Sequence, residues 1–321
     1  MTTLPWQAGQ APYVTPDQLY SPEAGGSQWP IGVQFGTIPD IQGATPAQQY
    51  AVIAMIAQQA TTRAEQIVHF PLRSVISTEE LEGPHFRVTV QRSSFNGRII
   101  LTRWPVTQVL SLQVCPNSVW PRQWTTVPAG YYEPEFPVPG LYGTSAPSGA
   151  GEGAQSIIVA PGYITWDLGR QGWRVKVTYI HGWPHTALTA AANAGDSTIA
   201  VDDCTAWAPP SGSTVGAAGI VYDALSGGQE SVTCTTASAS SGPGTLTLAS
   251  PLAYAHSAGI MVSCLPQGAI WATALLAGAA ALTRGATATT IQTTSGRGQM
   301  ASRGGLEEQA HHMLKALRQT I

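Results

Sequence analysis

The clearest alternation of apolar and polar positions lies at residues 173–184, WRVKVTYIHGWP. Val175, Val177 and Tyr179 alternate with polar residues, which is the period of a strand with one buried face. The strand has to end at the Gly-Trp-Pro that follows, because proline has no N–H to donate to a ladder. A compositionally different β segment comes next, and helical spacing resumes only after Leu265. We therefore interpret this strand as the point where a core domain is interrupted and later completed.

Helical spacing appears in three places. The first helix starts at Thr45, which can cap it together with Pro46 and Gln48, and runs to about Val68. The second spans 267–284 and can end in a left-handed cap at Gly285. The third is a short amphipathic helix at 306–317. The apolar run inside the second helix is shorter than the roughly 20 residues that span a bilayer, so it predicts a buried helix.

A period of two appears in two further groups. The first runs from 86 to 114 with a hairpin signal at Asn96-Gly97, and continues at 157–159 and 164–167. The second consists of short runs punctuated by Gly, Ser, Pro and Asp, which is typical of a small barrel or sandwich. Its runs lie at 197–201, 219–222, 230–234, 245–248 and 260–262.

These patterns predict an α+β fold. A helical core, made of the long N-terminal helix and the C-terminal helices, packs with a small antiparallel sheet, and an all-β domain is inserted into it. The predicted domains are an extended N-terminal arm at 1–44, an α+β core at 45–185 and 265–321, and a small barrel or sandwich at 186–264. Residues 115–155 read as turns and short hairpins, and 286–305 as a long mobile loop.

The Pro- and Gly-rich arm has two interpretations. No helical or strand period survives its prolines, which fits a disordered tail. It also carries five aromatics, among them Trp6, Tyr13 and Trp29, which fits an extended arm that anchors on a neighbouring subunit and is ordered by assembly.

Composition and charge narrow the function. Hydrophobic residues make up 43% and charged residues only 10%, well below the usual quarter, which favours a surface largely covered by contacts. Net charge is −3 over 1–44, +2 over 45–185, −5 over 186–265 and +3 over 266–321. No dense Lys/Arg run is present, so sequence-specific nucleic-acid binding is not expected.

The sequence offers no catalytic, cofactor or metal site. The four cysteines form no CxxC, and we expect each to be a small buried residue. His181 and His185 flank Pro184, which excludes helical metal-ligand spacing, so they are expected in a turn. Asp202-Asp203 is expected in a solvated turn that could bind a cation weakly. The first residues lack the basic and apolar regions of a signal peptide. We expect a protein that is not an enzyme.

Tryptophan is abundant, with ten residues, and several precede proline, including Trp104 and Trp183. Core filling is the simpler interpretation of each. The alternative is contact with another subunit, where tryptophan supplies a large apolar area at low entropy cost.

Three stretches together resemble a known family. They are Leu101, Arg103, Pro105 and Val106 in RIILTRWPVTQVLSLQV, then Val175, Val177, Tyr179 and Gly182 in WDLGRQGWRVKVTYIHGWP, then Pro266 and Ile270 in LPQGAIWATALLAGAAALTRGA. In order and spacing they are similar to the head-to-tail connector (adaptor) proteins of long-tailed bacteriophages. The resemblance covers roughly 45–184 and 265–321. The arm, the acidic β insert and the 286–305 loop depart from the short form of the family.

The resemblance implies a structural protein of the virion neck, assembled in the host cytoplasm. It implies a homo-oligomeric ring, a dodecamer, beneath the portal protein. The ring would meet a stopper or tail-terminator protein and extend the channel through which genomic DNA passes, without sequence-specific binding and without a membrane partner. The candidate interface residues are Trp6, Tyr13, Trp29, Trp104, Trp183, Arg297, Met300 and Arg303. The alternative function is a carbohydrate- or surface-binding β-rich module, which the tryptophan count and the 186–264 segment favour.

Overall fold

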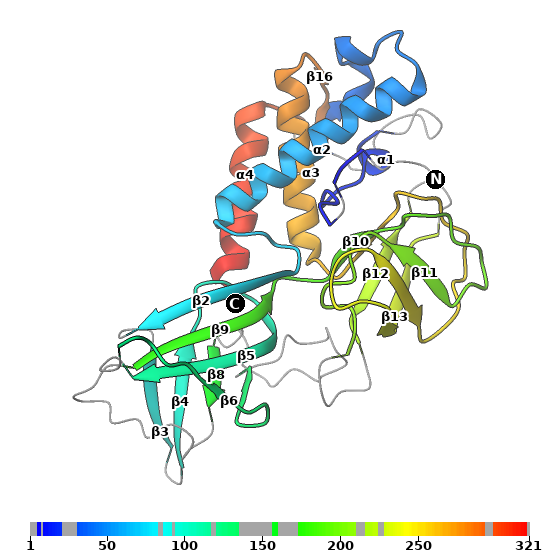
Figure 1. The fold of residues 1–321 in the computed structure, drawn as a ribbon. Helices are drawn as coiled ribbons and strands as arrows, with labels where there is room; N and C mark the ends of the chain where they lie inside the picture. Colours follow the sequence, from blue (N-terminus) through cyan, green and yellow to red (C-terminus); the bar gives the residue numbers. More distant parts are fainter. Residues whose placement is uncertain are drawn as a thin grey trace. The chain divides into compact units, whose positions relative to one another are not determined.

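The computed structural model describes residues 5–7, 9–20, 31–82, 86–91, 94–116, 120–134, 156–159, 173–209, 216–223, 228–292 and 298–319. Contacts divide the chain into two units. Unit 1 comprises Met1–Leu72 and Pro184–Gln319, and unit 2 comprises Arg73–Trp183 with Thr320–Ile321. Figure 1 shows the elements of both units.

The long helices of unit 1 form where their sequences predict. Helix α2 (Pro46–Val68) begins with the expected capping box, in which the Thr45 hydroxyl accepts from the Gln48 N–H and the Gln48 side chain accepts from the Thr45 N–H. Helix α3 (Gln267–Thr283) ends at Gly285, whose φ of +90° is left-handed. The Gly285 and Ala286 N–H groups then donate to the carbonyls of Leu282 and Ala281, which satisfies the last carbonyls of the helix. Helix α4 (Arg303–Gln319) extends beyond the predicted 306–317 at both ends.

Helix α3 lies between α2 and α4 (Figure 1) and is buried along most of its length. A helix that is apolar all round is expected in such an interior position. Gly278 lies where α3 packs tightly against its neighbours, because an added Cβ would lie 3.0 Å from Ile31 Cδ1 and 3.3 Å from Leu306 Cδ1. The predicted apolar face of α4 is confirmed at Leu306, Ala310 and Leu314, which are all buried.

The described part of the N-terminal segment packs on its own chain. It contains α1 (Pro16–Leu19), β1 (Val33–Gln34) and 3₁₀ turns at Phe35–Thr37 and Pro39–Ile41. Tyr13 holds it to α2: its N–H donates to Thr61 Oγ1 (3.0 Å), its hydroxyl donates to Glu65 Oε1 (2.6 Å), and the same hydroxyl accepts from the Leu72 N–H (2.8 Å). Long-range contacts of this kind leave no local period in the sequence.

A six-stranded antiparallel sheet completes unit 1, in the order β10-β15-β12-β13-β14-β11. All five runs predicted between 197 and 262 are strands here, and β10 adds a sixth. The strands are β10 (His185–Ala187), β11 (Thr198–Val201), β12 (Ala218–Tyr222), β13 (Glu230–Ala237), β14 (Gly244–Leu248) and β15 (Met261–Ser263). Their inward positions alternate with outward ones, as in the buried Ile199 and Val201 of β11.

Unit 2 consists of two four-stranded antiparallel sheets that share one core. The first has the order β2-β9-β5-β6 and the second β3-β4-β8-β7. The strands are β2 (Val75–Glu82), β3 (Phe86–Gln91), β4 (Ser94–Ile100), β5 (Val106–Pro116), β6 (Thr125–Val127), β7 (Tyr132–Pro134), β8 (Ser156–Val159) and β9 (Trp173–His181). The shared core contains Leu81, Ile99, Leu101, Val106, Leu112, Val114, Val127, Ile157, Val159, Val175, Val177 and Tyr179.

The predicted fold class is wrong. A helical core packed with a small antiparallel sheet does not describe this chain, which is mostly β, with two four-stranded sheets and a six-stranded sheet. The sequence hides part of this content because β2 is rich in glutamate (VISTEELE) and several strands have only two to four residues. Pairing with a neighbouring strand, rather than local propensity, decides such segments.

The prediction of an unstructured loop at 286–305 is also wrong for its described residues. Strand β16 (Thr287–Ala288) pairs with β1, and β17 (Thr290–Gln292) pairs with β18 (Gly298–Met300). Residues 293–297 and the strand predicted at 164–167 lie outside the described residues.

Candidate functional site

The most distinctive surface of unit 1 is a groove of about 490 Å³ across α2, α3 and α4. Its polar lining is dominated by three arginines, Arg63 of α2, Arg284 at the end of α3 and Arg303 at the start of α4. Between them lie small or apolar residues, including Leu276 and Ala280. The short side chains at the helix contacts allow three helices to converge here and leave the groove open.

The arginines of this groove are only partly neutralised. Arg284 lies 3.5 Å from Asp40 Oδ2, and Arg303 donates to Glu307 Oε1 at 3.1 Å. Arg63 contacts the Gln66 amide oxygen at 3.4 Å and makes no ion pair within the described part of the chain. Each guanidinium has five N–H donors, and exposed pairs of this kind contribute about 0–1 kcal/mol. The groove can therefore exchange these contacts for the carboxylates of a partner.

A second depression of about 370 Å³ continues from the groove along α2 and shares Gln59 and Arg63 with it. Met55 forms one wall and is 41% exposed. The Gln58 Oε1 atom is buried there and has no hydrogen-bond partner among the described residues. Unpaired buried acceptors are rare in folded proteins, and this oxygen is out of reach of an outside donor while the side chain keeps this position.

The structure separates the candidate interface residues into three sets. Arg303 lines the groove, and Met300, three residues before it, is 65% exposed. Tyr13 is buried in unit 1, and Trp6 is half-buried with its Nε1–H donating to Asp202 Oδ2 at 3.4 Å. Trp104 and Trp183 are buried in unit 2, whereas Trp29 and Arg297 lie outside the described residues.

Core filling is therefore the correct interpretation of Trp104 and Trp183. Their rings meet edge to face with centroids 6.1 Å apart and both are 5% exposed. This geometry suits the aromatic quadrupole. In the monomer neither side chain offers area to a second subunit.

The histidines expected in a turn are buried strand residues. His181 ends β9, where its Nε2 accepts from Ser77 Oγ at 3.0 Å, and Ser77 Oγ in turn accepts from Arg103 at 2.5 Å. Burial, together with the Arg103 charge, lowers the pKa of His181 to about 4. A neutral imidazole held by a buried serine links β2, β9 and the 101–105 segment. Because the serine is itself buried, this pair is structural and not a nucleophile with a base.

His185 joins β10 to the N-terminal segment. Its Nε2–H points at the carbonyls of Ala11 (3.2 Å) and Pro12 (3.1 Å), and its Nδ1 accepts from Ser263 Oγ (2.9 Å). The Tyr13 ring stands edge-on to it at 5.3 Å. His185, Ser263 and Tyr13 therefore hold segment 11–13 against the six-stranded sheet.

The prediction of a solvated turn at Asp202-Asp203 is wrong. Asp202 is 2% exposed and its Oδ1 accepts from Thr186 Oγ1 (2.6 Å) and from the Ala187 N–H (2.9 Å). Asp203 is 9% exposed and accepts from the Thr205 N–H and hydroxyl and from the Gly242 N–H. These carboxylates serve as internal acceptors for backbone donors.

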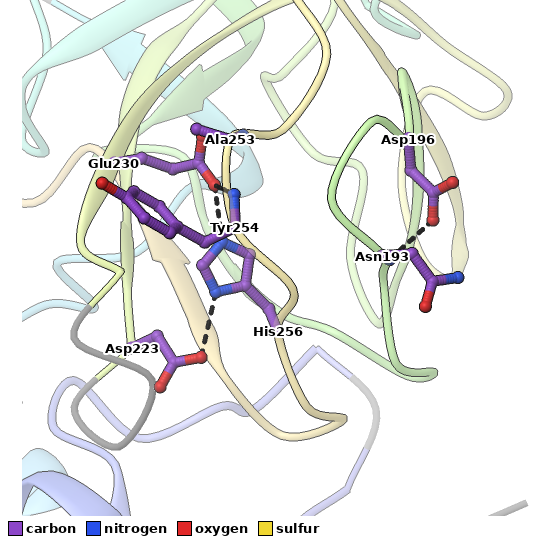
Figure 2. Close-up of polar contacts among 7 residues, drawn as sticks. All are labelled: Asn193, Asp196, Asp223, Glu230, Ala253, Tyr254 and His256. Atoms are coloured by element: carbon purple, nitrogen blue, oxygen red, sulfur yellow. Dashed lines mark hydrogen bonds and ion pairs between the residues drawn. The ribbon is translucent and has the colours of Figure 1, made fainter.

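A second polar cluster surrounds His256 (Figure 2), and no pattern in the sequence predicts it. The fully buried ring of His256 lies between two carboxylates, with Nδ1 2.9 Å from Asp223 Oδ2 and Nε2 2.7 Å from Glu230 Oε1. Each ring nitrogen thus lies within hydrogen-bond distance of a carboxylate oxygen. Glu230 also accepts from the Ala253 and Tyr254 N–H groups. Burial opposes ionisation of Glu230, but these hydrogen bonds outweigh it and the pKa of Glu230 is lowered.

The cluster is a closed structural element. The two nitrogens of His256 face carboxylates, so neither is free to bind a metal, and among the described residues no group of three His, Cys, Asp or Glu side chains could hold a metal ion. The backbone of His256 also exchanges two hydrogen bonds with Ala192. A single histidine with two acidic residues 26 and 33 positions away gives no sequence signal, because the contact depends on the sheet.

No helix in the described part of the chain is long and apolar enough to cross a membrane. Comparison of the sequence with models of protein families, with curated proteins and with solved structures finds no match in any of the three. The residues of this chain are therefore the basis for its proposed function.

Proposed function

We propose that this chain is a subunit of a head-to-tail connector ring in a bacteriophage neck, located beneath the portal and continuing the DNA channel. The observation that carries the proposal is the joint arrangement of the residues on which the resemblance rests. Strands β5 and β9 are neighbours, so the first two motifs lie side by side, with Val106 opposite His181. The Gly182 N–H donates to the Pro105 carbonyl at 2.9 Å, and Gly182 has a φ of +88°.

The other motif residues also contribute to the structure, some in unit 2 and some in unit 1. Arg103 reaches Ser77, and the Tyr179 hydroxyl donates to Glu79. Val175 and Val177 fill the core that the two sheets share. Pro266 stands at the N-cap of α3, and Ile270 is fully buried. Each of these motif residues thus has a structural role within its own unit, although a fold alone never fixes a function.

The groove of unit 1 supports an assembly role. A ring subunit needs two different recognition surfaces, because head-to-tail contacts join unlike patches. The groove places Arg63, Arg284 and Arg303 on an open helical surface, and Met300, three residues before Arg303 in the sequence, is exposed. Arginine and methionine are both enriched at protein interfaces.

The alternative, a carbohydrate- or surface-binding β module, receives less support. Such a module needs exposed aromatic rings on the six-stranded sheet. Trp207 is fully buried there and Tyr222 is 6% exposed, which leaves Tyr254, at 48%, as the exposed aromatic in the described part of 186–264. The connector role therefore has the better support of the two.

The test uses the full chain and a purified portal ring. Native mass spectrometry and negative-stain images of the chain alone and with the portal are expected to show a closed ring and a stable complex. The variant R63E/R303E is expected to weaken the assembly, and so, to a smaller degree, is R63E alone. K315E, which makes the same charge change as R63E at an exposed site further along α4, is expected to retain it. A wild-type chain that neither forms a ring nor binds the portal would refute the proposal.

A further inference from the structure

The groove across α2, α3 and α4 has the form of a trough. Its floor is formed by the last two turns of α3, from Leu276 to Arg284, which extend for about 12 Å. Because α3 lies between α2 and α4, the residues of α2, Gln59 and Arg63, form one wall, and the first turn of α4 forms the other. The trough is therefore long enough for about two turns of a further helix.

Two of the three arginines of this trough are already paired. Arg303 donates to Glu307 Oε1 at 3.1 Å, and Arg284 lies 3.5 Å from Asp40 Oδ2. Arg63 is exposed and makes no ion pair among the residues that the structure describes. The lining residues and their ion-pair partners thus have a surplus of one positive charge, and it belongs to Arg63.

The free guanidinium of Arg63 determines which charge an occupant has to carry. A partner that covers the trough removes Arg63 from water, and a buried cation without a partner is strongly unfavourable. A neutral or basic occupant is therefore disfavoured, whereas a carboxylate can accept two parallel hydrogen bonds from the guanidinium. Arg284 and Arg303 keep their own carboxylates and place no further demand on the charge of the occupant.

The apolar lining determines the rest of the occupant. Ala60, Leu276 and Ala280 line the trough beside the charges, and Met55, which is 41% exposed, continues this surface along α2. An extended segment lying there would leave its backbone groups without partners, because the lining residues all belong to helices or helix ends. A helix bonds its own backbone, and small side chains allow two helices to approach to about 8–10 Å.

We propose that the trough binds an amphipathic helix of a partner protein, which places an apolar residue on the floor and a carboxylate, one turn away, on Arg63. Side chains three or four residues apart share one face of a helix. Nucleic acid fits less well, because its phosphates would meet Glu307 and Asp40 and offer no apolar group to the floor, and its binding requires several free cations. This inference rests on the proposed function, because it names the partner chemistry of the surface assigned there to assembly.

The test titrates the full chain into fluorescein-labelled, alanine-based helical peptides and measures fluorescence anisotropy. Two peptides carry a leucine and a glutamate one turn apart, in opposite orders, and their controls carry glutamine in place of glutamate. One glutamate peptide is expected to bind about tenfold or more tightly than its control. R63Q is expected to remove this difference, whereas K315Q, the same loss of one charge at an exposed site of α4, should keep it. R63E is expected to prefer the corresponding lysine peptide, a reversal that unfolding cannot produce.

The outcomes separate this inference from the connector role. Glutamate peptides that bind no more tightly than their controls, that bind R63Q equally well, or that do not bind at all overturn the helix site. A labelled oligothymidine that binds wild type but not R63Q assigns the trough to nucleic acid and also overturns it. Ring formation and portal binding by the wild-type chain decide the connector role independently, so a ring without peptide selectivity leaves the connector, and peptide selectivity without ring or portal binding leaves only the trough.

Discussion

Replacing His256 with alanine should loosen the 252–256 segment from the ends of β12 and β13. The side chains of His256, Asp223 and Glu230 are 0%, 4% and 12% exposed, so solvent screens their contacts little. H256A removes both side-chain hydrogen bonds of the ring and leaves Asp223 and Glu230 without the partner that they share. Breaking a buried pair of this kind costs about 3–5 kcal/mol, and two hydrogen bonds to charged groups at about 1.5–3 kcal/mol each give the same range.

Hydrogen exchange followed by mass spectrometry is the suitable assay, because it reports on this region separately from unit 2. The relevant amides are those of Ala192, Gly195, Leu252 and His256, which bond between the 192–196 turn and the 252–256 segment. A loss of about 4 kcal/mol would speed their exchange by roughly a thousandfold at pH 7. S257A, an exposed neighbour, is the control and should stay within about 0.5 kcal/mol of wild type.

A second variant tests the reason for the loss. D223N/E230Q/H256Q removes the charges together with the histidine, so no buried carboxylate is left unpaired. Its loss is expected to be smaller than that of H256A, because the penalty comes from the uncompensated charges. Exchange in H256A that matches S257A, or a triple variant that loses more than H256A, would refute the account of the cluster.

Three further predictions concern stability. Y13F removes the donor to Glu65 and leaves the Leu72 N–H without its acceptor, so thermal unfolding should show a loss of about 1–3 kcal/mol. Y254F, at a ring that is 48% exposed, should show almost none. G216A sets a Cβ 2.5 Å from the Cys234 carbonyl oxygen and 2.6 Å from that of Trp207, which should lower the free energy of unfolding by about 1–3 kcal/mol or more. G304A, which has open space on α4, should raise it by about 0.5–1 kcal/mol. Equal effects of the two variants would contradict the packing around Gly216. The pKa of about 4 for His181 lies below its ordinary 6.5, so the unfolded chain binds a proton first as pH falls; stability is complete above pH 6.5 and should fall by about 3 kcal/mol towards pH 4. Exchange at the β9 amides measures this loss, and H181Q should abolish the pH dependence; a wild-type profile that is flat between pH 6.5 and 4 would count against it.

Local signals account for the helices and for most of the strands of 186–264. The Thr45-Pro46 cap, the Gly285 end of α3 and the runs such as 245–248 all depend on neighbours in sequence, so their predictions are confirmed. Strand β2 could not be predicted in the same way. Its VISTEELE sequence becomes a strand because β9 pairs with all eight residues, a contact about one hundred residues away.

The candidate sites depend still more on tertiary contacts. Arg303 was singled out within a loop, but its place in the groove follows from the packing of α4 against α3. The His256 cluster likewise brings together residues that alternation assigns to separate strands and turns.

The internal use of carboxylates in the six-stranded sheet has a consequence for its exterior. Residues 186–264 contain five acidic and no basic residues, yet Asp202, Asp203 and Asp223 are buried, and Asp196 and Glu230 accept hydrogen bonds from their own chain. Water therefore meets mainly hydroxyl, amide and methyl groups there. Hydrogen bonds do not cancel the charge of these carboxylates, so the segment should repel a polyanion at a distance, and the repulsion should weaken as ionic strength rises.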